Sequence, residues 1–307
     1  MQNKERKFLE IINGALAKNS YIGDDCAFLE DFGLVMTQDT LIEGIHFDCV
    51  SRCGGGGSEP STTGTTMAAM TPKQIGRRAI LVNISDILAS GAKPKYLTVS
   101  LSGALDEAFV SEFYAGINEI CEEFDTEIVG GDLTGGEKIT VSICALGDTA
   151  GRQISSRSNA YKGYVIAVRG VFGAGLLSNY VLEPKLYQTA AEIIATKCRK
   201  PYALMDSSDS LYDCLAQISR QSGVSMAVEF KKIPSVEDLG GDFKTTLFGG
   251  EDYALVGCFD PNDFETVQNA GARLVPIGTV IAAKGVQNGV FIDGKKIEED
   301  FTYAHKF

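Results

Sequence analysis

The sequence predicts an α/β protein of the α+β type that is divided into two domains. A chain of 307 residues is long enough for one large domain or two medium ones. Segments with a helical spacing of apolar residues alternate with short β-rich runs through both halves, which is typical of mixed α/β folds. Near residues 148–158 the composition changes to small and polar residues. We therefore expect an N-terminal domain at residues 1–148 and a C-terminal domain at residues 149–307.

The elements of the N-terminal half follow from apolar spacing and from helix-end signals. Apolar residues recur at helical intervals through residues 4–18, which predicts a first helix. Thr71-Pro72 combines an N-cap residue with proline at the first helical position, and predicts a helix that ends near Gly91. The other predicted elements of this half are a helix at 106–124 and strands at 33–37, 96–102, 127–130 and 139–146.

The C-terminal half continues the alternation of strands and helices. Near its end, Asp293-Gly294 lies between two short runs and predicts a hairpin with a type I′ turn over residues 290–298. The other predicted elements are strands at 164–168, 203–206, 225–229, 253–259 and 274–281, and helices at 187–199, 209–221 and 261–269.

Residues 49–70 have an unusual composition, which includes the run CGGGGSEPSTTGTTMAAM. The segment has few large apolar side chains, so it cannot bury enough surface to offset its ordering entropy. Glycine-rich loops that bind phosphate are short and lie between a strand and a helix, whereas no strand immediately precedes this segment. We therefore predict a mobile surface insertion at 49–70.

The composition excludes several classes of function. Hydrophobic residues make up 44% of the chain and charged residues 22%, as in ordinary globular proteins, so extensive disorder is excluded. The 28 Lys and Arg residues against 40 Asp and Glu residues give a net charge of −12, which argues against partners such as nucleic acid or an anionic membrane surface. No apolar run is long enough for a transmembrane helix or resembles a signal-peptide core, so we expect a cytoplasmic protein.

Carboxylates recur beside Gly, Ser or Thr, at the ends of strand-like runs or in turns. Asp86 is different, because it lies in an otherwise apolar helical segment, where a carboxylate is costly unless it is paired or binds a cation. Each of these residues alone has an ordinary explanation as a turn or cap residue. If the strands share one sheet and end at the same edge, however, the side chains converge. The other positions are Asp24, Asp25, Asp39, Asp132, Asp206, Asp209, Glu251 and Asp252.

A cluster of aspartates requires cations, because adjacent carboxylates repel each other and raise each other's pKa. Oxygen ligands suit Mg²⁺, which proteins usually hold with a few carboxylates together with substrate phosphates. The pattern therefore favours an enzyme that acts on a polyphosphate with several Mg²⁺ ions. The usual nucleotide-binding motifs, GxxxxGK[ST] and the protein-kinase set, are absent. His46, Cys49 and Cys53 outline a zinc motif, H-x2-C-x3-C, but no fourth ligand is evident.

Six motifs, in this order, closely resemble those of thiamine-monophosphate kinase: IGDDCAF, QDTLIEGIHF, LVNISDILASGAKP, VGGDLTGG, MDSSDSLYD and FGGEDY. The resemblance covers nearly the whole chain apart from the insertion. More distantly, the chain resembles the superfamily of aminoimidazole ribonucleotide synthetase and selenophosphate synthetase. The resemblance implies a homodimer built through mixed-sheet N-terminal domains, with ATP and several Mg²⁺ ions bound between the two domains. The implied reaction is ATP + thiamine monophosphate → ADP + thiamine diphosphate.

The resemblance also assigns roles to individual residues. The implied metal ligands are Asp25, Thr37, Gln38, Asp39, Asp86, Asp132, Asp206 and Asp209. The implied ATP contacts are Tyr114, Gly131, Asp132, Arg157 and Ser208, and the implied substrate contacts are His46, Glu251 and Tyr303. Of these residues, Asp209 and Arg157 are the implied catalytic pair.

Two positions depart from the family pattern. Gln38 replaces a small hydroxyl residue in the metal-binding run, so only a backbone contact is expected there. Ser210 replaces the glycine of an Asp-x-Ser-Asp-Gly motif, and serine tolerates a positive φ poorly.

The resemblance implies direct in-line phosphoryl transfer. The phosphate of the substrate is already anionic at neutral pH, because the second pKa of a phosphomonoester is about 6. No strong general base is needed, and positioning together with charge neutralisation by Mg²⁺ and Arg157 would supply the catalysis.

Two alternatives stay open. One is a sister ATP-dependent synthetase of the same superfamily. Selenophosphate synthetase requires a reactive Cys or selenocysteine and a Lys ahead of the first metal aspartates, whereas Cys26 follows them here. The other alternative is an inactive nucleotide- or thiamine-binding homologue, which the changes at Gln38 and Ser210 and the insertion would support.

Overall fold

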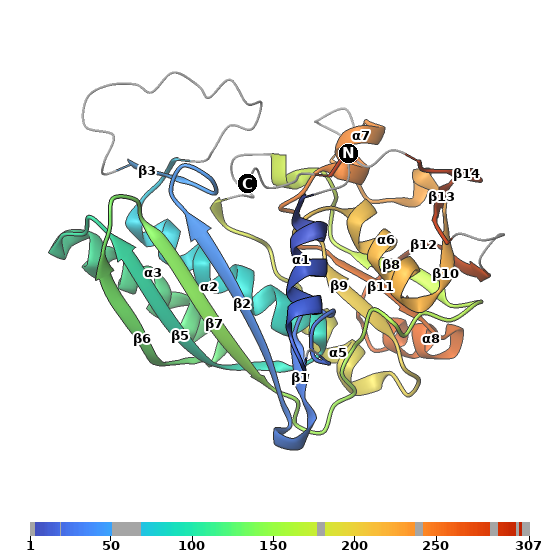
Figure 1. Ribbon diagram of the computed structural model, residues 1–307. Coiled ribbons are helices and arrows are strands. Elements are labelled where there is room, and N and C mark those ends of the chain that lie inside the picture. The colour runs from blue at the N-terminus through green and yellow to red at the C-terminus, as the bar shows by residue number, and fades with distance from the viewer. Residues whose placement is uncertain are drawn as a thin grey trace.

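In the computed structural model, the described residues form two large β-sheets that lie side by side, each with helices packed against it (Figure 1). Residues 27–148 supply the strands of the first sheet and residues 165–296 those of the second. The mixed α/β class that the sequence predicts is therefore confirmed, while the division into domains at residue 148 stays a prediction. The structure describes residues 4–18, 20–50, 69–176, 182–236, 242–282, 288–298 and 301–302.

The first sheet has five strands in the order β1-β2-β7-β5-β6. Neighbouring strands are antiparallel, except that β5 and β6 are parallel. Along β2 and β7, buried residues alternate with more exposed ones, as expected for a sheet with one covered face. The strands are β1 (Ala27–Leu29), β2 (Leu34–Ile42), β5 (Lys93–Gly103), β6 (Glu127–Gly135) and β7 (Thr140–Asp148), and the 3-10 helix η1 (Glu30–Phe32) joins β1 to β2.

Two long helices, α2 (Pro72–Ser90) and α3 (Glu107–Phe124), cover one face of this sheet (Figure 1). Helix α2 begins at the predicted cap, where the Thr71 hydroxyl accepts a hydrogen bond from the Gln74 amide and the Gln74 side chain accepts one from the Thr71 amide. It ends at Gly91, whose φ of 90° is left-handed. Buried residues occur on all sides of α2, because it packs against the first sheet, against α3 and against β9 of the second sheet.

The second sheet has seven strands in the order β14-β13-β10-β12-β8-β11-β9. Strand β9, at one edge, is buried along its whole length because it faces α2. The strands are β8 (Val165–Arg169), β9 (Ala203–Asp206), β10 (Val224–Val228), β11 (Leu255–Phe259), β12 (Val275–Ala282), β13 (Val290–Ile292) and β14 (Lys295–Lys296). The predicted turn is confirmed, since Asp293 and Gly294 both have positive φ, 49° and 81°.

Short helices connect the strands of the second sheet. They are α5 (Gln188–Lys197), α6 (Leu211–Ser222), α7 (Phe243–Phe248), α8 (Pro261–Asn269), and the 3-10 helices η3 (Ala174–Leu176) and η4 (Phe230–Lys232). Helix α7 and strand β1 are not among the predicted elements, because six and three residues are too few to show a period.

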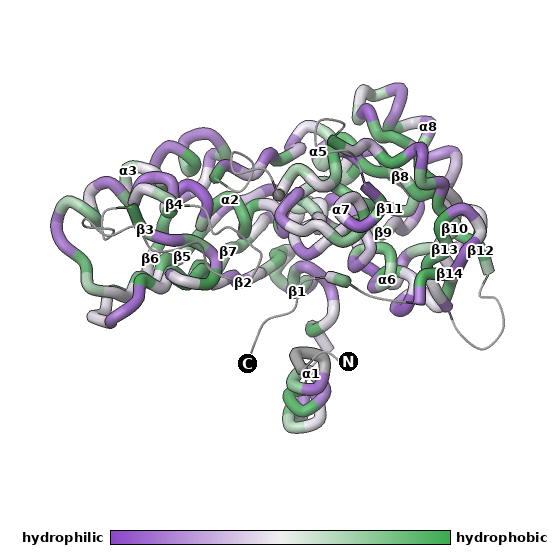
Figure 2. The backbone as a smooth tube through the Cα atoms, turned by 90° about the horizontal axis from the view of Figure 1, so that it is seen from above, coloured by the Kyte–Doolittle hydropathy of each residue, from purple (hydrophilic) through white to green (hydrophobic). Residues whose placement is uncertain are grey.

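Helix α1 (Lys4–Ala15) forms where the apolar spacing predicts a helix, but it stands apart from both sheets (Figure 2). Its apolar side chains Phe8, Ile11 and Ile12 are 42%, 65% and 47% exposed. A helix this short is marginally stable in water without a packing partner. Among the described residues, none of the helices is both long and apolar enough to cross a membrane.

Two short strands, β3 (Asp48–Cys49) and β4 (Ala69–Met70), pair in parallel at the two ends of the predicted insertion. Residues 51–68 lie outside the described residues, so the expectation of a mobile segment is not addressed by the structure.

Helices α2 and α3 approach each other closely where glycines face the opposite backbone. A Cβ added at Gly116 would lie 2.1 Å from the carbonyl oxygen of Lys73, and a Cβ added at Gly76 would lie 2.2 Å from that of Phe113. Both distances are far below van der Waals contact, so the crossing requires glycine at each position.

We expect Gly116→Ala to lower the free energy of unfolding by about 1–3 kcal/mol, because the helices must separate to admit the methyl group. Urea unfolding followed by circular dichroism measures this change. The matched control is Gly14→Ala in α1, where an added Cβ meets nothing within 4 Å, and where alanine should stabilise the helix by about 0.5–1 kcal/mol. Equal effects at the two positions would contradict the role of close helix packing.

Candidate active site

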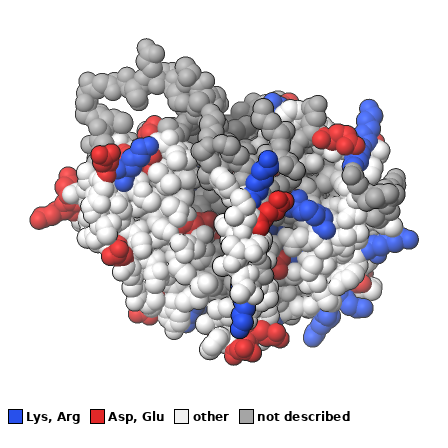
Figure 3. Space-filling model, viewed as in Figure 1, with Lys and Arg blue, Asp and Glu red and all other residues white. Residues whose placement is uncertain are grey.

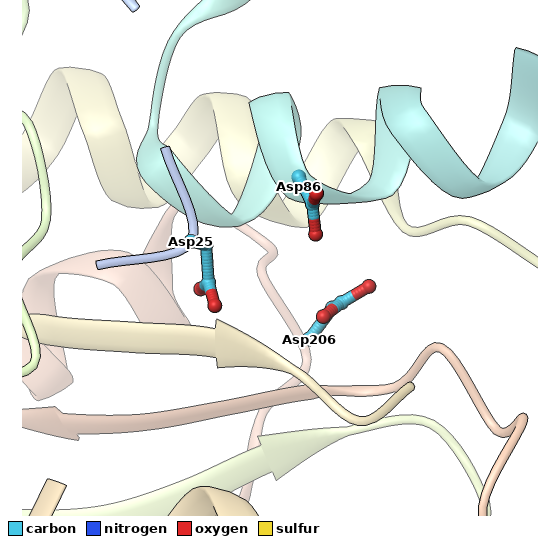
Figure 4. A group of neighbouring side chains, drawn as sticks. All are labelled: Asp25, Asp86 and Asp206. Carbon is cyan, nitrogen blue, oxygen red and sulfur yellow. The ribbon is translucent and has the colours of Figure 1, made fainter. Parts of the chain in front are cut away.

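Three aspartates meet where the two sheets adjoin. Asp25 lies in the loop before β1, Asp86 lies in α2, and Asp206 is the last residue of β9. One carboxylate oxygen of each lies within 4.8 Å of those of the other two. Figure 4 shows the three side chains approaching a common space from a loop, a helix and the end of a strand. We call these three residues the aspartate cluster.

Hydroxyl groups orient two of the carboxylates. Thr37 Oγ1 donates to Asp86 Oδ2 at 2.7 Å, and Ser85 Oγ donates to Asp206 Oδ2 at 2.5 Å. These bonds cross between elements, because Thr37 lies in β2 and Ser85 lies in α2. The carboxylates are therefore held by the packing of α2 against both sheets.

Burial and mutual repulsion raise the pKa values of the clustered carboxyls. Burial, followed by the charge of Asp25, raises the pKa of Asp206 to about 8. Burial, followed by the charge of Asp206, raises the pKa of Asp86 well above its ordinary value. Burial also raises the pKa of Asp25, although Arg157 opposes this shift. A bound cation would favour the deprotonated form of these carboxyls.

Arg157 lies beside the cluster and forms an ion pair with Asp25. Its guanidinium also donates to the Gln217 side chain at 2.5 Å and to the carbonyl of Gly23 at 3.1 Å. Burial opposes the charge of Arg157, but the Asp25 carboxylate raises the pKa of Arg157 above its ordinary value. A permanent positive charge therefore stands next to the first aspartate.

Strand β2 separates its predicted site residues onto two faces. Thr37 and Asp39 lie on the face toward α2, where the amide of Asp39 donates to Asn83 Oδ1 at 3.1 Å. Burial, followed by the charge of Glu251, raises the pKa of Asp39 to about 6. The side chain of Gln38 lies on the opposite face and donates to Ser142 Oγ at 3.1 Å. A metal contact of Gln38 could therefore involve only its backbone, as the sequence suggests.

The turn after β9 brings Ser208 and Asp209 next to the cluster. Ser208 Oγ donates to Asp206 Oδ1 at 3.4 Å, and the charge of Asp209 contributes to the raised pKa of Asp206. Ser210, which replaces the family's glycine, has φ 178°, an extended conformation open to any residue. Its hydroxyl caps α6 by accepting from the Asp213 amide at 3.0 Å. The replacement therefore causes no backbone strain.

The predicted substrate residues His46 and Glu251 are joined through Arg78 of α2. Arg78 Nη2 donates to Glu251 Oε2 at 2.6 Å, and Nη1 donates to the main-chain oxygen of His46 at 2.8 Å. The Nδ1 atom of His46 accepts a hydrogen bond from the Ile42 amide at 2.9 Å, which leaves Nε2 as the donor. Arg78 thus links the main chain of His46 to Glu251, whose charge raises the pKa of Asp39.

Three predicted site residues that the structure describes are not brought to the cluster. Gly131 and Asp132 lie in the exposed edge strand β6, and Gly131 stands in the same cross-strand row as Asp39, three strands away. At about 4.8 Å per strand, that separation is about 14 Å, too far to share one metal ion. Tyr114 is 38% exposed on α3, and Tyr303 lies outside the described residues. The roles of these four residues stay predictions.

The strands of the predicted site do not share one sheet, so that premise for convergence is wrong. Asp39 lies within a strand of the first sheet, whereas Asp206 ends a strand of the second. Asp86 reaches the cluster from a helix between them. The convergence results from the packing of two sheets about α2, rather than from one strand edge.

The aspartate cluster fits a divalent cation that prefers oxygen ligands. The three carboxylates each have an oxygen close to those of the other two, and the Thr37 hydroxyl lies next to them. Together they provide the oxygen ligands that Mg²⁺ prefers. Within the described part of the chain, this is the only group of three or more His, Cys, Asp or Glu residues with converging ligand atoms. Of the zinc motif, Cys53 lies outside the described residues.

Sequence reasoning missed several polar residues of this site. Arg78, Asn83 and Ser85 are all buried in α2, and Gln217 lies in α6. The sequence does contain a signal for the residues of α2, namely polar residues within the apolar stretch from Ile75 to Leu88. In a helix that is buried on all sides, each polar side chain needs a specific hydrogen-bond or charge partner.

The chain is similar to proteins of a known family and to a solved structure. Residues 23–149 match the family described as AIR synthase related protein, N-terminal domain. The chain is 30% identical to thiamine-monophosphate kinase of Aquifex aeolicus (strain VF5), covering 92% of each protein. It is 31% identical to that of Synechococcus elongatus, covering 78% of this chain and 77% of the relative. A solved structure of AaThiL complexed with AMPPCP and TMP matches 100% of this chain with a TM-score of 0.82 at 28% identity, and 99% of that chain is covered.

The raised pKa of Asp206 predicts a pH dependence of stability for the metal-free protein. The folded protein holds a proton on Asp206 up to about pH 8, whereas an unfolded aspartate loses it near 3.8. Because the folded state binds more protons in this window, the free energy of unfolding falls as the pH rises from about 4 to 8. Asp206→Asn removes this loss, so its stability relative to the wild type should increase with pH.

Thermal unfolding in EDTA at several pH values measures the difference between Asp206→Asn and the wild type. The control is Asp125→Asn, an exposed aspartate whose pKa the hydrogen bond from Lys93 lowers, and whose variant should show no such increase. A stability difference for Asp206→Asn that stays constant between pH 4 and 8 would refute the pKa assignment.

Proposed function

This chain belongs to the thiamine-monophosphate kinase family, and we propose that it makes thiamine diphosphate by direct in-line transfer of the γ-phosphoryl group of ATP to thiamine monophosphate. Its relatives carry the name of that enzyme, and the similar solved structure is complexed with AMPPCP and TMP. These comparisons support ATP and thiamine monophosphate as the two substrates.

The observation that carries the proposal is the aspartate cluster between the two sheets. One oxygen of each of three carboxylates lies within 4.8 Å of those of the other two, so the cluster favours the binding of a cation or of a cation-bound polyphosphate. We propose that Asp25, Asp86 and Asp206 hold Mg²⁺, with Asp39 and Asp209 beside them. Bound there, Mg²⁺ would neutralise the charge of the phosphates of ATP.

The residues of the chain would position the reactants. Arg157 would place a fixed positive charge beside the transferring group, and its bond to Gln217 limits the directions in which it can point. No residue is needed as a strong base, because the phosphate of thiamine monophosphate is already anionic, with a second pKa of about 6. Catalysis would therefore rest on orientation and charge.

On the substrate side, we propose that His46 and Glu251 bind thiamine monophosphate. Both lie beside Arg78, and Glu251 is close enough to Asp39 to raise its pKa. The substrate would therefore lie with one end near the aspartate cluster, as in-line transfer requires.

The structure accommodates the two substitutions that would support an inactive homologue. Gln38 directs its side chain away from the site, and Ser210 adopts an extended conformation and caps a helix. Neither change removes a side chain from the cluster. The active enzyme is therefore the function that the site supports best.

We propose a homodimer formed through the uncovered face of the first sheet. Met36, Leu146 and Tyr96 form a cross-strand row on the side away from α2 and α3. Met36 and Tyr96 are 39% and 36% exposed, an apolar surface that a second copy could cover. Few charged side chains appear over β7 and β5 on this face (Figure 3). Helix α1, which has exposed apolar residues, lies on the same side of the molecule (Figure 2).

We also propose that the enzyme acts in the cytoplasm. None of the seven described cysteines forms a disulfide with another described residue. Several buried thiols without disulfides are typical of proteins from a reducing compartment.

We expect Asp39→Asn and Asp209→Asn to fold normally but to lose about a hundredfold or more in kcat, because each removes charge beside the bound polyphosphate. A coupled assay of ADP release with thiamine monophosphate, at low millimolar Mg²⁺, measures the loss. Asp125→Asn is the control, because this exposed aspartate follows α3 and pairs with Lys93. Near-normal turnover in both site variants would exclude the proposed metal cluster.

A charge placed in the apolar row should disrupt the dimer. We expect Leu146→Glu to shift the mass in solution from 65.8 kDa, which is twice 32.9 kDa, to that of one chain. Light scattering coupled to size exclusion measures the mass. The control is Phe32→Glu, which changes an apolar side chain that is 77% exposed in η1, outside the row, and should leave the dimer intact. A single-chain mass for the wild type would refute the dimer.

A further inference from the structure

Arg78 is a buried cation whose role the metal and nucleotide contacts do not explain. Its side chain is 1% exposed, and a guanidinium in that environment is costly unless its partners compensate. Its two terminal nitrogens contact Glu251 Oε2 at 2.6 Å and the main-chain oxygen of His46 at 2.8 Å. One side chain of α2 therefore connects the two residues that we assign to substrate binding.

The loop that presents Glu251 requires support from its surroundings. Glu251 and Tyr253 have φ values of 65° and 49°, which residues other than glycine adopt only when the surrounding structure imposes them. The amide of Glu251 donates to the carbonyl of Ser208 at 2.6 Å, which ties the loop to the turn after β9. The hydroxyl of Tyr253 donates to the same Oε2 atom as Arg78, at 3.0 Å.

These contacts determine how the carboxylate of Glu251 is oriented. Both hydrogen bonds that the described residues make to this carboxylate go to Oε2. The other oxygen is thereby left for a ligand, and the Glu251 side chain is 36% exposed. Burial opposes the charge of Arg78, but Glu251 raises the pKa of Arg78 above its ordinary value, so the ion pair persists.

We propose that Arg78 is a positioning residue for the thiamine end of the substrate. It holds the Glu251 carboxylate by Oε2, with Oε1 directed toward the ligand, and fixes the separation between Glu251 and the main chain of His46. The thiazolium ring of thiamine is cationic and its aminopyrimidine ring carries N–H donors, so an oriented carboxylate is complementary to it. This inference rests on the proposed function.

The test compares Arg78→Met and Arg78→Lys with the wild type, with thiamine monophosphate and ATP varied separately. We expect Arg78→Met to raise the KM for thiamine monophosphate about tenfold or more, and to leave the KM for ATP within about twofold. Arg78→Lys should restore part of the loss, because an ammonium group can pair with Glu251 but does not reproduce the fork that reaches both acceptors.

The matched control is Arg77→Met. Arg77 is the neighbouring arginine of α2, and it pairs with Glu119 and Glu183 instead of with the site. Its substitution should leave both KM values unchanged. Equal increases in both KM values for Arg78→Met would indicate a merely structural role and would overturn the proposal.

A double-mutant cycle tests whether Arg78 acts through Glu251. In a Glu251→Gln background, Arg78→Met should weaken thiamine monophosphate binding by much less than it does in the wild type. If the losses of affinity from the two substitutions are instead additive, the proposal is overturned. Calorimetry of thiamine monophosphate binding provides the affinities without turnover. If Arg78→Met does not fold, the same cycle with Arg78→Lys decides. Absence of wild-type turnover would refute the proposed function, whereas normal turnover with unchanged affinity in the Arg78 variants would refute only this inference.

Discussion

The structure depends on holding several carboxylates close together at the junction of two sheets. Burial and mutual repulsion raise the pKa values of Asp206 and Asp86 far above those of exposed aspartates. Such a group persists only where donors and cations surround it, and the Thr37 and Ser85 hydroxyls and the Arg157 guanidinium meet this need in part. The remaining negative charge makes the site suitable for Mg²⁺ and a polyphosphate.

Helix α2 is the element that connects the clustered carboxylates to the rest of the fold. It packs against the first sheet on one side and against β9 on the other, so a polar residue on almost any of its faces meets a partner. Asp86 belongs to the cluster and Ser85 donates to Asp206 within it. Asn83 accepts a hydrogen bond from the backbone amide of Asp39, and Arg78 contacts the proposed substrate residues. Helix α2 thus positions both the aspartate cluster and the residues proposed to bind the substrate.

Much of the fold could be predicted from the sequence, because its elements carry strong local signals. The Thr71-Pro72 pair begins α2 and Gly91 ends it, and Asp293-Gly294 forms a turn, because these residue types favour helix ends and tight turns. Helix α7 and strand β1 were not predicted, because they are too short to show a helical or strand period of apolar residues. The strain expected at Ser210 is absent, because the φ of a residue depends on the turn that it occupies in the folded chain.

For the site, the sequence by itself determined which residue types are available: aspartates beside small residues, one of them in an apolar helix, in an order that resembles a known kinase family. Local composition is enough for that conclusion, because an unpaired buried carboxylate implies a cation. Only the tertiary structure decided which of them converge. Asp206 joins Asp25 and Asp86, whereas Asp132 stands at a distant sheet edge, because a contact between remote segments depends on how two sheets pack about α2.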